Sequence, residues 1–469
     1  MTTNLVASDV TRQRTAHLTQ ERLDLSSHQS APTRIAIVGM GYVGSVTGAC
    51  LAGAGNDVTF AEVNPAKVAQ LNAGQSPVVE KDVPELVQTS RAEGRLRATN
   101  DLGSCVSEAN TVIVCVGTPT GRNGDVHLGD LEKVCLQIGS ALVERSEWLL
   151  VIITSTIPPG TTESMIIPCL EEASSKKCGT DFGVVFSPEF LREGSAVADF
   201  RNPMITILGA SDERALRAAT ELYEPFGGQI EAVSVGVAET VKLVGNAWHA
   251  LKVVFANEVG RFCESQDIDS RAVMDIFKED RRLNVSAAYL NPGFAFGGSC
   301  LPKDLRTLNY RARLEGVDLP VLENILRSNR AHIDLALQKI EEYGAQRVAV
   351  LGLAFKHGTD DLRESPNLEL VERLIGKGYD VRLHDDSVLL PRLVGANREH
   401  LLRTLPRVAA YLVDDLDEAL SGADVVVITQ GNPAYAEIVN RLAPGQHVLD
   451  LVGVARASGG DSRYRGLLW

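Results

Sequence analysis

The chain has 469 residues, of which 44% are apolar and 23% are charged, and its formal net charge is −14. This composition is typical of a globular protein with room for about three domains. The negative balance excludes nucleic acid as a main partner, because binding to a phosphate backbone requires a basic face. No run of roughly 18 consecutive apolar residues is present, so we predict no membrane-spanning helix and no membrane partner.

The eight cysteines form no Cys-x-x-Cys pair, so we expect no zinc site and no other metal. Scattered cysteines in a chain of this length are typical of a reducing, cytoplasmic location. Residues 1–32 are polar and lack the apolar segment of a secretory signal. We therefore interpret them as a flexible N-terminal extension.

The first predicted domain, residues 33–236, alternates short apolar strands with helices, which predicts a parallel, doubly wound sheet. The predicted strands cover residues 34–38, 58–63, 111–116, 149–154, 182–186 and 204–208.

The motif Gly39-Met-Gly41-Tyr-Val-Gly44 lies between the first strand and a helix, the context that supports a dinucleotide fingerprint. Its glycines permit a tight turn and let a pyrophosphate approach the N-terminus of the helix. Glu62, about 20 residues further on, ends the second predicted strand, where an acid accepts a hydrogen bond from the ribose. An acid there repels a 2′-phosphate, so we predict NAD rather than NADP. The alternative is a glycine turn in an unrelated unit.

Thr118 and Thr156 each follow a buried strand. Ligands of such sheets bind beyond the carboxyl ends of the strands, so both hydroxyls are candidates for the cofactor crevice. Capping of the next helices is the alternative for each. Glu189 and Glu193 are spaced i, i+4, which places both on one face if the segment is helical, as candidates to orient water or bind a sugar hydroxyl. Helix capping and surface charge are the alternative for this pair.

The second predicted domain, residues 237–344, is largely helical and begins with a long helix over residues 238–266. Lys242, Asn246, His249 and Asn257 lie close to one face of this helix, whose other residues are mostly apolar. A narrow polar stripe on a buried helix indicates a lining for a polar ligand. A solvated face is the competing interpretation.

Cys300 lies between a diglycine and Pro-Lys-Asp304, a sequence that favours the start of a helix. The helix N-terminus and Lys303 both favour thiolate over thiol, so we predict a nucleophile with a lowered pKa. The competing interpretation is a small buried hydrophobic residue. Two preceding glycines and two following charges favour the nucleophile.

The third predicted domain, residues 345–469, is a second α/β unit, with strands predicted at 347–351, 380–384, 425–429 and 447–451 and a helix at 365–377. Lys356 and Arg363 follow its first strand and are candidate phosphate ligands. The predicted fold class is therefore α/β, with two Rossmann-like doubly wound domains joined by a central helical domain.

Four motifs resemble those of the UDP-glucose/GDP-mannose dehydrogenase family. They are the glycine motif 39–44, Pro188-Glu-Phe-Leu-Arg-Glu193, Gly293-Phe-Ala-Phe-Gly-Gly-Ser-Cys-Leu-Pro-Lys-Asp304 and Gly358-Thr-Asp-Asp-Leu-Arg-Glu-Ser365. Residues 246–258 and the Phe-Ala-Phe-Gly-Gly spelling are most similar to the GDP-mannose branch. The resemblance implies that the central domain builds a homodimer or higher homo-oligomer. It also implies oxidation of a nucleotide sugar at C6 to the uronate, with two NAD⁺ consumed.

The resemblance also implies two sets of contacts. NAD contacts come from Tyr42, Val43, Glu62, Lys67, Thr118, Thr156, Lys303 and Arg363. Sugar-nucleotide contacts come from Glu193, Lys242, Asn246, His249, Asn257, Tyr289 and Lys356.

Two features depart from the GDP-mannose branch. That branch tends to carry Tyr-Tyr-x-Arg before the cysteine motif, whereas this chain has Ala288-Tyr-Leu-Asn291. One aromatic ring and one cation are missing, so UDP-glucose or another UDP-sugar remains the alternative to GDP-mannose. The ribose acid is Glu62 where that branch commonly has aspartate.

The residues fit this chemistry as a hypothesis. Cys300 adds to the aldehyde produced by the first oxidation, so that a second hydride can leave and a thioester forms. Lys242 and Asn246 stabilise the oxyanion, Asp304 holds water or balances Lys242, and Glu189 is the candidate base for hydrolysis. The rivals are a two-electron hydroxyacid dehydrogenase, which needs no cysteine, and a nucleotide-binding redox sensor or inactive assembly protein.

Overall fold

The computed structural model describes residues 32–121, 124–281, 288–388, 395–455 and 461–469. All but the last residue of the expected N-terminal extension lies outside these ranges. The compact unit that carries the rest of the molecule runs from Arg34 to Trp469.

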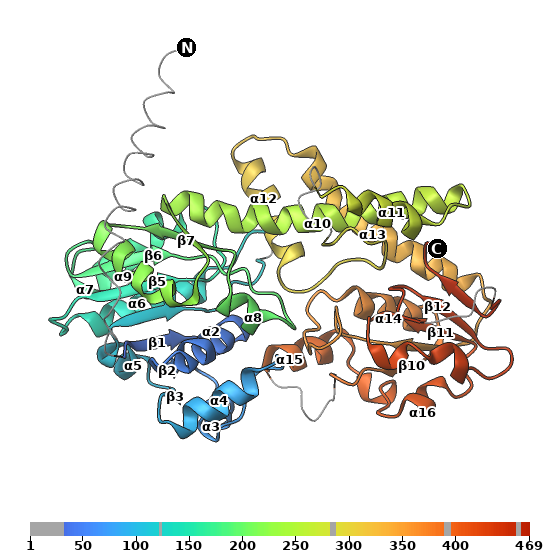
Figure 1. The fold of residues 1–469 in the computed structure, drawn as a ribbon, viewed down its shortest axis with the longest axis horizontal. Coiled ribbons are helices and arrows are strands. Elements are labelled where there is room, and N and C mark those ends of the chain that lie inside the picture. The colour runs from blue at the N-terminus through green and yellow to red at the C-terminus, as the bar shows by residue number, and fades with distance from the viewer. Residues whose placement is uncertain (1–31, 122–123, 282–287, 389–394, 456–460) are drawn as a thin grey trace, which may run out of the picture. The chain divides into compact units, whose positions relative to one another are not determined.

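An eight-stranded sheet forms the first part of this unit, in the order β3-β2-β1-β4-β5-β6-β7-β8 (Figure 1). Its strands are β1 (Arg34–Val38), β2 (Asp57–Ala61), β3 (Leu96–Thr99), β4 (Thr111–Val114), β5 (Leu149–Ile153), β6 (Phe182–Phe186), β7 (Ile205–Ala210) and β8 (Gln229–Val233). Neighbouring strands are parallel except β6 and β7, which pair antiparallel. The expectation of an all-parallel first sheet is therefore wrong at this pair.

The central strands of this sheet are buried on both faces. Along β1, Ile35 and Ile37 belong to one apolar core, while Ala36 and Val38 belong to another. This alternation is the consequence of side chains pointing to opposite faces of a sheet that helices cover on both sides. The helices of this part are α2 (Tyr42–Gly53), α3 (Pro65–Asn72), α4 (Val83–Ala92), α5 (Leu102–Glu108), α6 (Gly129–Leu142), the π-helix η2 (Thr162–Ile166), α7 (Ile167–Ser174), α8 (Ala196–Arg201), α9 (Glu213–Tyr223) and the 3₁₀-helix η3 (Glu224–Phe226).

A helical segment follows the sheet. It consists of α10 (Val235–Ser265), α11 (Ser270–Glu279), α12 (Leu301–Leu314) and α13 (Pro320–Glu341). Figure 1 shows α10 as one uninterrupted helix, against which α12 and α13 pack. None of the helices in the described ranges has the length and apolar character needed to span a bilayer.

The last part contains a five-stranded parallel sheet in the order β10-β9-β11-β12-β13. Its strands are β9 (Arg347–Leu351), β10 (Asp380–His384), β11 (Val425–Ile428), β12 (His447–Asp450) and β13 (Tyr464–Gly466). Its helices are α14 (Pro366–Gly376), α15 (Gly395–Thr404), α16 (Leu416–Leu420) and the 3₁₀-helices η4 (Val408–Ala410), η5 (Pro433–Tyr435) and η6 (Ile438–Arg441). The mixed α/β fold with largely parallel sheets is thus confirmed.

Three strands were not expected from the sequence, namely β3, β8 and β13. Each lies at the edge of its sheet. Edge strands keep one side toward solvent and carry polar residues, so they lack the continuous apolar run that predicts a buried strand. The expected end of β2 is also corrected, because the strand stops at Ala61 and Glu62 follows it directly.

Candidate active site and cofactor site

The glycine motif forms the turn between β1 and α2. Gly41 is the N-cap of α2, and no acidic side chain occupies the first turn of the helix. A Cβ atom on Gly44 would lie 2.1 Å from the Gly39 carbonyl oxygen, so only glycine fits at this third position. The free N–H groups at the start of α2 are thus open to an anionic group such as a pyrophosphate.

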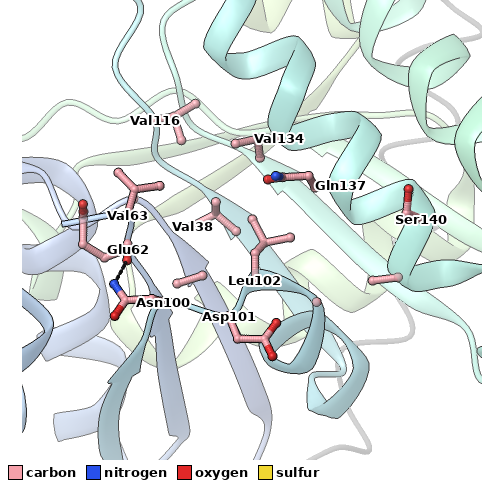
Figure 2. Close-up of a pocket in the computed structure, with 14 residues that line it drawn as sticks. Val38, Glu62, Val63, Asn100, Asp101, Leu102, Val116, Val134, Gln137 and Ser140 are labelled. Atoms are coloured by element: carbon pink, nitrogen blue, oxygen red, sulfur yellow. Dashed lines mark hydrogen bonds between the residues drawn. The ribbon is translucent and has the colours of Figure 1, made fainter. Parts of the chain in front are cut away.

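Glu62 lies beside this turn and borders a cavity of about 770 Å³ (Figure 2). Its two carboxylate oxygens accept hydrogen bonds from the backbone N–H groups of Met40 (2.8 Å) and Asn64 (2.9 Å). These bonds fix the carboxylate and leave further lone pairs for a ribose. The cavity is lined by Val38, Val63, Leu102 and Val116, among others. Asn100, Asp101, Gln137 and Ser140 also line it. A partly apolar cavity with a fixed acid at Glu62 fits the adenosine half of NAD.

Other expected cofactor residues surround the same turn. Lys67 Nζ donates a hydrogen bond to the Met40 carbonyl oxygen (3.0 Å) and so stabilises the glycine turn. Val43 lies in the first turn of α2 and is partly buried. The hydroxyl of Tyr42 donates to Glu80, and burial, with the nearby Glu80 carboxylate, raises the pKa of Tyr42 well above its usual range. Tyr42 is therefore a neutral hydrogen-bond donor at the edge of the turn.

Thr118 and Thr156 lie side by side, since Thr118 Oγ1 donates to the Thr156 carbonyl oxygen (2.7 Å). Neither is the N-cap of the helix that follows it: Leu128 precedes α6 and Thr161 precedes η2. The helix-capping alternative is therefore wrong for both threonines. Their loops follow β4 and β5 at the carboxyl edge of the sheet, where cofactors bind in doubly wound folds.

Glu189 and Glu193 lie in the loop between β6 and α8, so the expectation that both lie on one helix face is wrong. The loop is stabilised by one of its own side chains, because Glu189 Oε2 accepts from Leu191 N–H (2.8 Å). Buried Glu80 accepts from Gly194 N–H (2.6 Å), which anchors the far end of the loop.

Lys242 is buried on α10 and points at this loop. Its Nζ donates to the Glu189 carbonyl oxygen (2.6 Å) and lies 2.9 Å from Glu189 Oε1. Burial lowers the pKa of Lys242, but Glu189, Cys300 and Asp304 together raise it above its ordinary value. Lys242 is thus a fixed ammonium group next to a carboxylate and a thiol.

One turn further along α10, Asn246 donates its side-chain amide to Asp304 Oδ2. Asp304 is fully buried in the first turn of α12. Its Oδ1 lies 2.7 Å from Lys303 Nζ, yet neither atom has a hydrogen bond of suitable geometry within the described residues. Two buried charged atoms without hydrogen bonds are suited to bind polar groups of a ligand.

Cys300 is the N-cap residue of α12, so the expected helix start is confirmed. The residue is exposed, but protein surrounds its thiol densely, and this desolvation raises the pKa of Cys300. Lys242 lowers that pKa, while Glu189 and Asp304 raise it further. The expectation of a lowered pKa is therefore wrong, because burial of the thiol, together with Glu189 and Asp304, outweighs the opposite effect of Lys242 and Lys303. The N-terminus of α12 favours the thiolate, and the sulfur lies among charged groups rather than in hydrocarbon.

A second group of charges lies at the start of the last α/β part. Burial and Asp361 raise the pKa of Glu193 to about 7, while Lys356 and Arg363 lower it. Lys356 Nζ donates to the Glu193 carbonyl oxygen. Arg363 pairs with Asp361 through two hydrogen bonds of 2.9 and 2.8 Å. Burial lowers the pKa of Arg363, but Asp361 first, and then Cys300 and Glu193, raise it above its ordinary value. Lys356 is therefore next to the loop that carries Glu189 and Glu193, called the acid loop below, and Arg363 is near Cys300.

His249 and Tyr289 stack with ring centroids 5.0 Å apart. Burial and three nearby cations, with Lys252 first among them, lower the pKa of His249. Asn257 lies apart from this pair. Both the oxygen and the nitrogen of its side-chain amide form hydrogen bonds with the main chain: the amide accepts from Gly293 N–H (3.1 Å) and donates to the Phe294 carbonyl oxygen (3.3 Å). Its amide therefore serves the segment before Cys300.

Two polar residues of α10 were not identified from the sequence. Lys252 is buried, with Nζ 5.3 Å from the ring centroid of Tyr289. Its spacing, three residues after His249, is the signal that would have found it. Glu239 is fully buried and accepts from Gly160 N–H (2.6 Å), Thr162 N–H (2.9 Å) and Thr162 Oγ1 (2.7 Å). No local sequence pattern indicates those partners.

Comparison with known proteins gives three family matches along the chain. The NAD binding domain of the UDP-glucose/GDP-mannose dehydrogenase family matches residues 33–227, its central domain matches 236–331 and its UDP binding domain matches 349–457.

The similarity extends to whole proteins. GDP-mannose 6-dehydrogenase of Pseudomonas aeruginosa is 44% identical over 420 residues, which cover 90% of this chain and 96% of that protein. A crystal structure of a ternary complex of GDP-mannose dehydrogenase from P. aeruginosa is 43% identical, with 93% of this chain and 100% of that chain covered and a TM-score of 0.54. A UDP-glucose dehydrogenase structure from Pyrobaculum islandicum is 31% identical, with 95% and 100% covered and a TM-score of 0.85. The chain belongs to the UDP-glucose/GDP-mannose dehydrogenase family and is an NAD-dependent nucleotide-sugar 6-dehydrogenase.

Proposed function

We propose that this enzyme oxidises GDP-mannose to GDP-mannuronate through a thiohemiacetal and a thioester on Cys300. One observation carries the mechanism: the charged side chains of Lys242, Glu189 and Asp304 all lie close enough to the Cys300 thiol to affect its pKa. Relatives named GDP-mannose 6-dehydrogenase share up to 44% identity, against 35% for a relative named UDP-glucose 6-dehydrogenase. That difference supports GDP-mannose as the substrate.

In the first half of the reaction the C6 alcohol gives up a hydride, and its hydroxyl proton passes to water, which leaves an aldehyde. NAD⁺, when bound beyond the carboxyl ends of β1 and β4, supplies the hydride acceptor for both oxidations. Gly39, Gly41, Tyr42, Val43, Gly44, Glu62, Lys67, Thr118, Thr156, Lys303 and Arg363 are the residues we propose to hold it. Lys242 and Asn246 place an ammonium and an amide toward the oxygen on which negative charge develops.

In the second half, Cys300 Sγ forms a bond to the aldehyde carbon, and the carbonyl oxygen becomes a hydroxyl. Loss of the second hydride from C6 and of the hydroxyl proton leaves a thioester. Water then adds to the thioester carbon and the C–S bond breaks, which returns the thiol and releases the carboxylate. Overall the alcohol and one water lose four electrons to two NAD⁺.

Glu189 is the base that we propose for the hydrolytic water. Lys242 occupies one of its oxygens and Leu191 N–H the other, and each oxygen retains a lone pair for water. Asp304 balances Lys242 and Lys303. The sugar nucleotide is bound, in this proposal, by Glu193, Lys242, Asn246, His249, Asn257, Tyr289 and Lys356.

Substrate choice is tested by parallel NADH assays with GDP-mannose, UDP-glucose and other UDP-sugars. We expect kcat/KM for GDP-mannose to exceed that for UDP-glucose by about 100-fold or more. The reason is that a site shaped for guanine leaves polar groups without hydrogen-bond partners when it binds uracil, which lowers the affinity for the transition state. The control is NAD⁺ saturation in each assay, so that only the sugar nucleotide varies. A UDP-sugar that turns over faster than GDP-mannose would assign the alternative substrate, as the altered Ala288 and Asn291 positions allow.

We further propose that residues 33–236 bind NAD, that 237–344 form a dimerisation domain and that 345–469 bind the sugar nucleotide. One face of α10 carries exposed apolar side chains at intervals of four, seven and seven residues: Val244, Trp248, Phe255 and Phe262. Such a stripe at helical spacing supports packing against a second copy of the helix. All eight cysteines are free, which supports a location in the reducing cytoplasm.

Replacement of Phe262, which is 64% exposed, with aspartate is expected to shift the protein toward monomers. Burial of the unpaired aspartate charge at an apolar interface destabilises the dimer, whereas the phenyl ring of Phe262 stabilises it in this proposal. Light scattering coupled to size-exclusion chromatography measures the mass. Met204→Asp is the control, because Met204 is 93% exposed and lies outside α10. An unchanged mass for Phe262→Asp would remove this face of α10 from the interface.

A further inference from the structure

The segment that leads into Cys300 has an unusual backbone environment. Residues Gly293–Phe296 form neither helix nor strand, and Phe294, Ala295 and Phe296 are each only 8% exposed. Buried backbone N–H and C=O groups need partners, and no strand in the described ranges pairs with this segment. Side chains from α10 and α13 take that place.

The first two residues of the segment are held by α10 and α13 together. Asn257 on α10 bonds Gly293 N–H and the Phe294 carbonyl, as described above. His332 on α13, fully buried, donates Nε2–H to the Gly293 carbonyl oxygen over 2.7 Å. Arg261 NH1 lies 3.1 Å from His332 Nδ1 and fixes the ring in this tautomer. Gly293 and Phe294 therefore have a fixed backbone position.

Among the residues that the structure describes, one side chain makes both backbone hydrogen bonds of Phe296. Asn329 on α13 accepts from Phe296 N–H over 3.0 Å and donates to the Phe296 carbonyl over 2.9 Å. The amide thus replaces both hydrogen bonds that an adjacent β-strand would make. Asn329 is buried, so water does not readily substitute for it.

Between Phe296 and the catalytic sulfur lie only Gly297, Gly298 and Ser299. Gly298 has φ +85°, a conformation that favours glycine, and the backbone of Gly297 packs closely on Glu364, because a Cβ atom there would lie 2.3 Å from the Glu364 carbonyl oxygen. The position of Cys300 relative to Lys242 therefore depends on the start of α12 on one side and on the anchored backbone of Phe296 and Gly297 on the other.

We infer that Asn329 is a positioning residue for Cys300, which sets the sulfur against C6 for thiohemiacetal formation. This inference rests on the proposed function of Cys300. A displacement of about 1 Å in a reacting group lowers a rate by about 100-fold, and Asn329 holds the anchor four residues from the sulfur.

The test compares Asn329→Leu in two backgrounds. In the enzyme with Cys300 intact, we expect kcat for uronate formation to fall about 100-fold, with KM for NAD⁺ changed less than about 3-fold. Asn324→Leu is the matched control, because Asn324 lies on the same helix and is exposed; it should leave kcat unchanged.

The second background is Cys300→Ala, which removes the step that Asn329 is inferred to serve. There the first oxidation is followed as NADH released in a single turnover, with a carbonyl trap to capture the aldehyde. We expect Asn329→Leu to change this rate by less than about 2-fold, since the sulfur is no longer needed. An equal loss in both backgrounds would mean a general structural role, and no loss in either would exclude any role; both outcomes overturn the inference.

A third variant covers the case in which Asn329→Leu does not fold. Asn329→Asp keeps the acceptor for Phe296 N–H and loses the donor to the Phe296 carbonyl oxygen. We therefore expect kcat to fall about 10-fold in the enzyme with Cys300 intact, and the NADH-release rate to stay unchanged in the Cys300→Ala enzyme. A loss in both backgrounds contradicts the inference. If Cys300→Ala alone still forms uronate with two NADH, the proposed function fails, whatever the Asn329 variants do.

Discussion

Replacing Cys300 with serine is expected to end uronate formation, with a fall of about 1,000-fold or more in kcat. A serine hydroxyl at the same place is far less acidic than a thiol, and an ester is a poorer intermediate than a thioester. Burial, with the neighbouring Glu189 and Asp304, raises the pKa even of the thiol, and the same surroundings oppose ionisation of the less acidic serine. The yield of NADH per sugar nucleotide should drop from two to at most one.

NADH is followed by absorbance, and the sugar product is identified by anion-exchange chromatography, which separates the uronate from its precursor. Cys169→Ser is the control, because Cys169 is partly buried on α7, away from the groups around Cys300. Its turnover and its two NADH per sugar should be unchanged. Two NADH per sugar from Cys300→Ser would remove the covalent intermediate and leave the family assignment intact.

Much of the first sheet could be predicted from local sequence. β1 and β6 have the predicted bounds, because each is a buried apolar run flanked by turn residues. The glycine turn after β1 could also be predicted from local sequence, because the close packing of Gly44 on the Gly39 carbonyl involves only one strand, the turn and the next helix. The edge strand β8 was not predictable in this way, because its pattern mixes Gln229 and Glu231 with apolar residues.

The site divides in the same manner. The start of α12 at Cys300 follows from Pro302 and Asp304 in its first turn, which are local signals. The electrostatics of the sulfur do not, since they depend on contacts far apart in the chain: 53 residues separate Lys242 from Glu189, and 58 separate Asn246 from Asp304. Periodicity showed that Lys242 and Asn246 share a face of α10, but not which carboxylates meet them.

The same reason explains why the acid loop was wrongly expected to be helical. The i, i+4 spacing of Glu189 and Glu193 is a helical pattern by itself. Three tertiary bonds override it: Lys242 holds Glu189, and Glu80 holds the Gly194 and Ala196 N–H groups. Asn257 is a further example, because periodicity placed it in the polar stripe but could not show that its amide also hydrogen-bonds the backbone before Cys300.

Loss of the ammonium in Lys242→Met is expected to lower kcat by about 100- to 1,000-fold, the usual effect of removing one donor from a preorganised oxyanion site. Nearby Glu189, Cys300 and Asp304 raise the pKa of Lys242 above its ordinary value despite burial. The side chain therefore stays protonated through the usual assay range of about pH 6 to 9. In the proposed mechanism Lys242 therefore stabilises negative charge on the sugar oxygen rather than acting as a base.

This assignment has a consequence for pH. If Lys242 were the proton acceptor, activity would rise with pH as the amine formed, and Lys242→Met would abolish that rise. Because it is a permanent cation here, Lys242→Met should lower the rate by a similar factor at each pH from about 6 to 9. Lys339→Met is the matched control: Lys339 is also a buried lysine paired with a carboxylate, that of Glu264, but it lies on α13 and has no proposed role in the reaction. A profile whose alkaline rise disappears only in Lys242→Met would contradict the oxyanion role, because a fixed positive charge has no titration to lose.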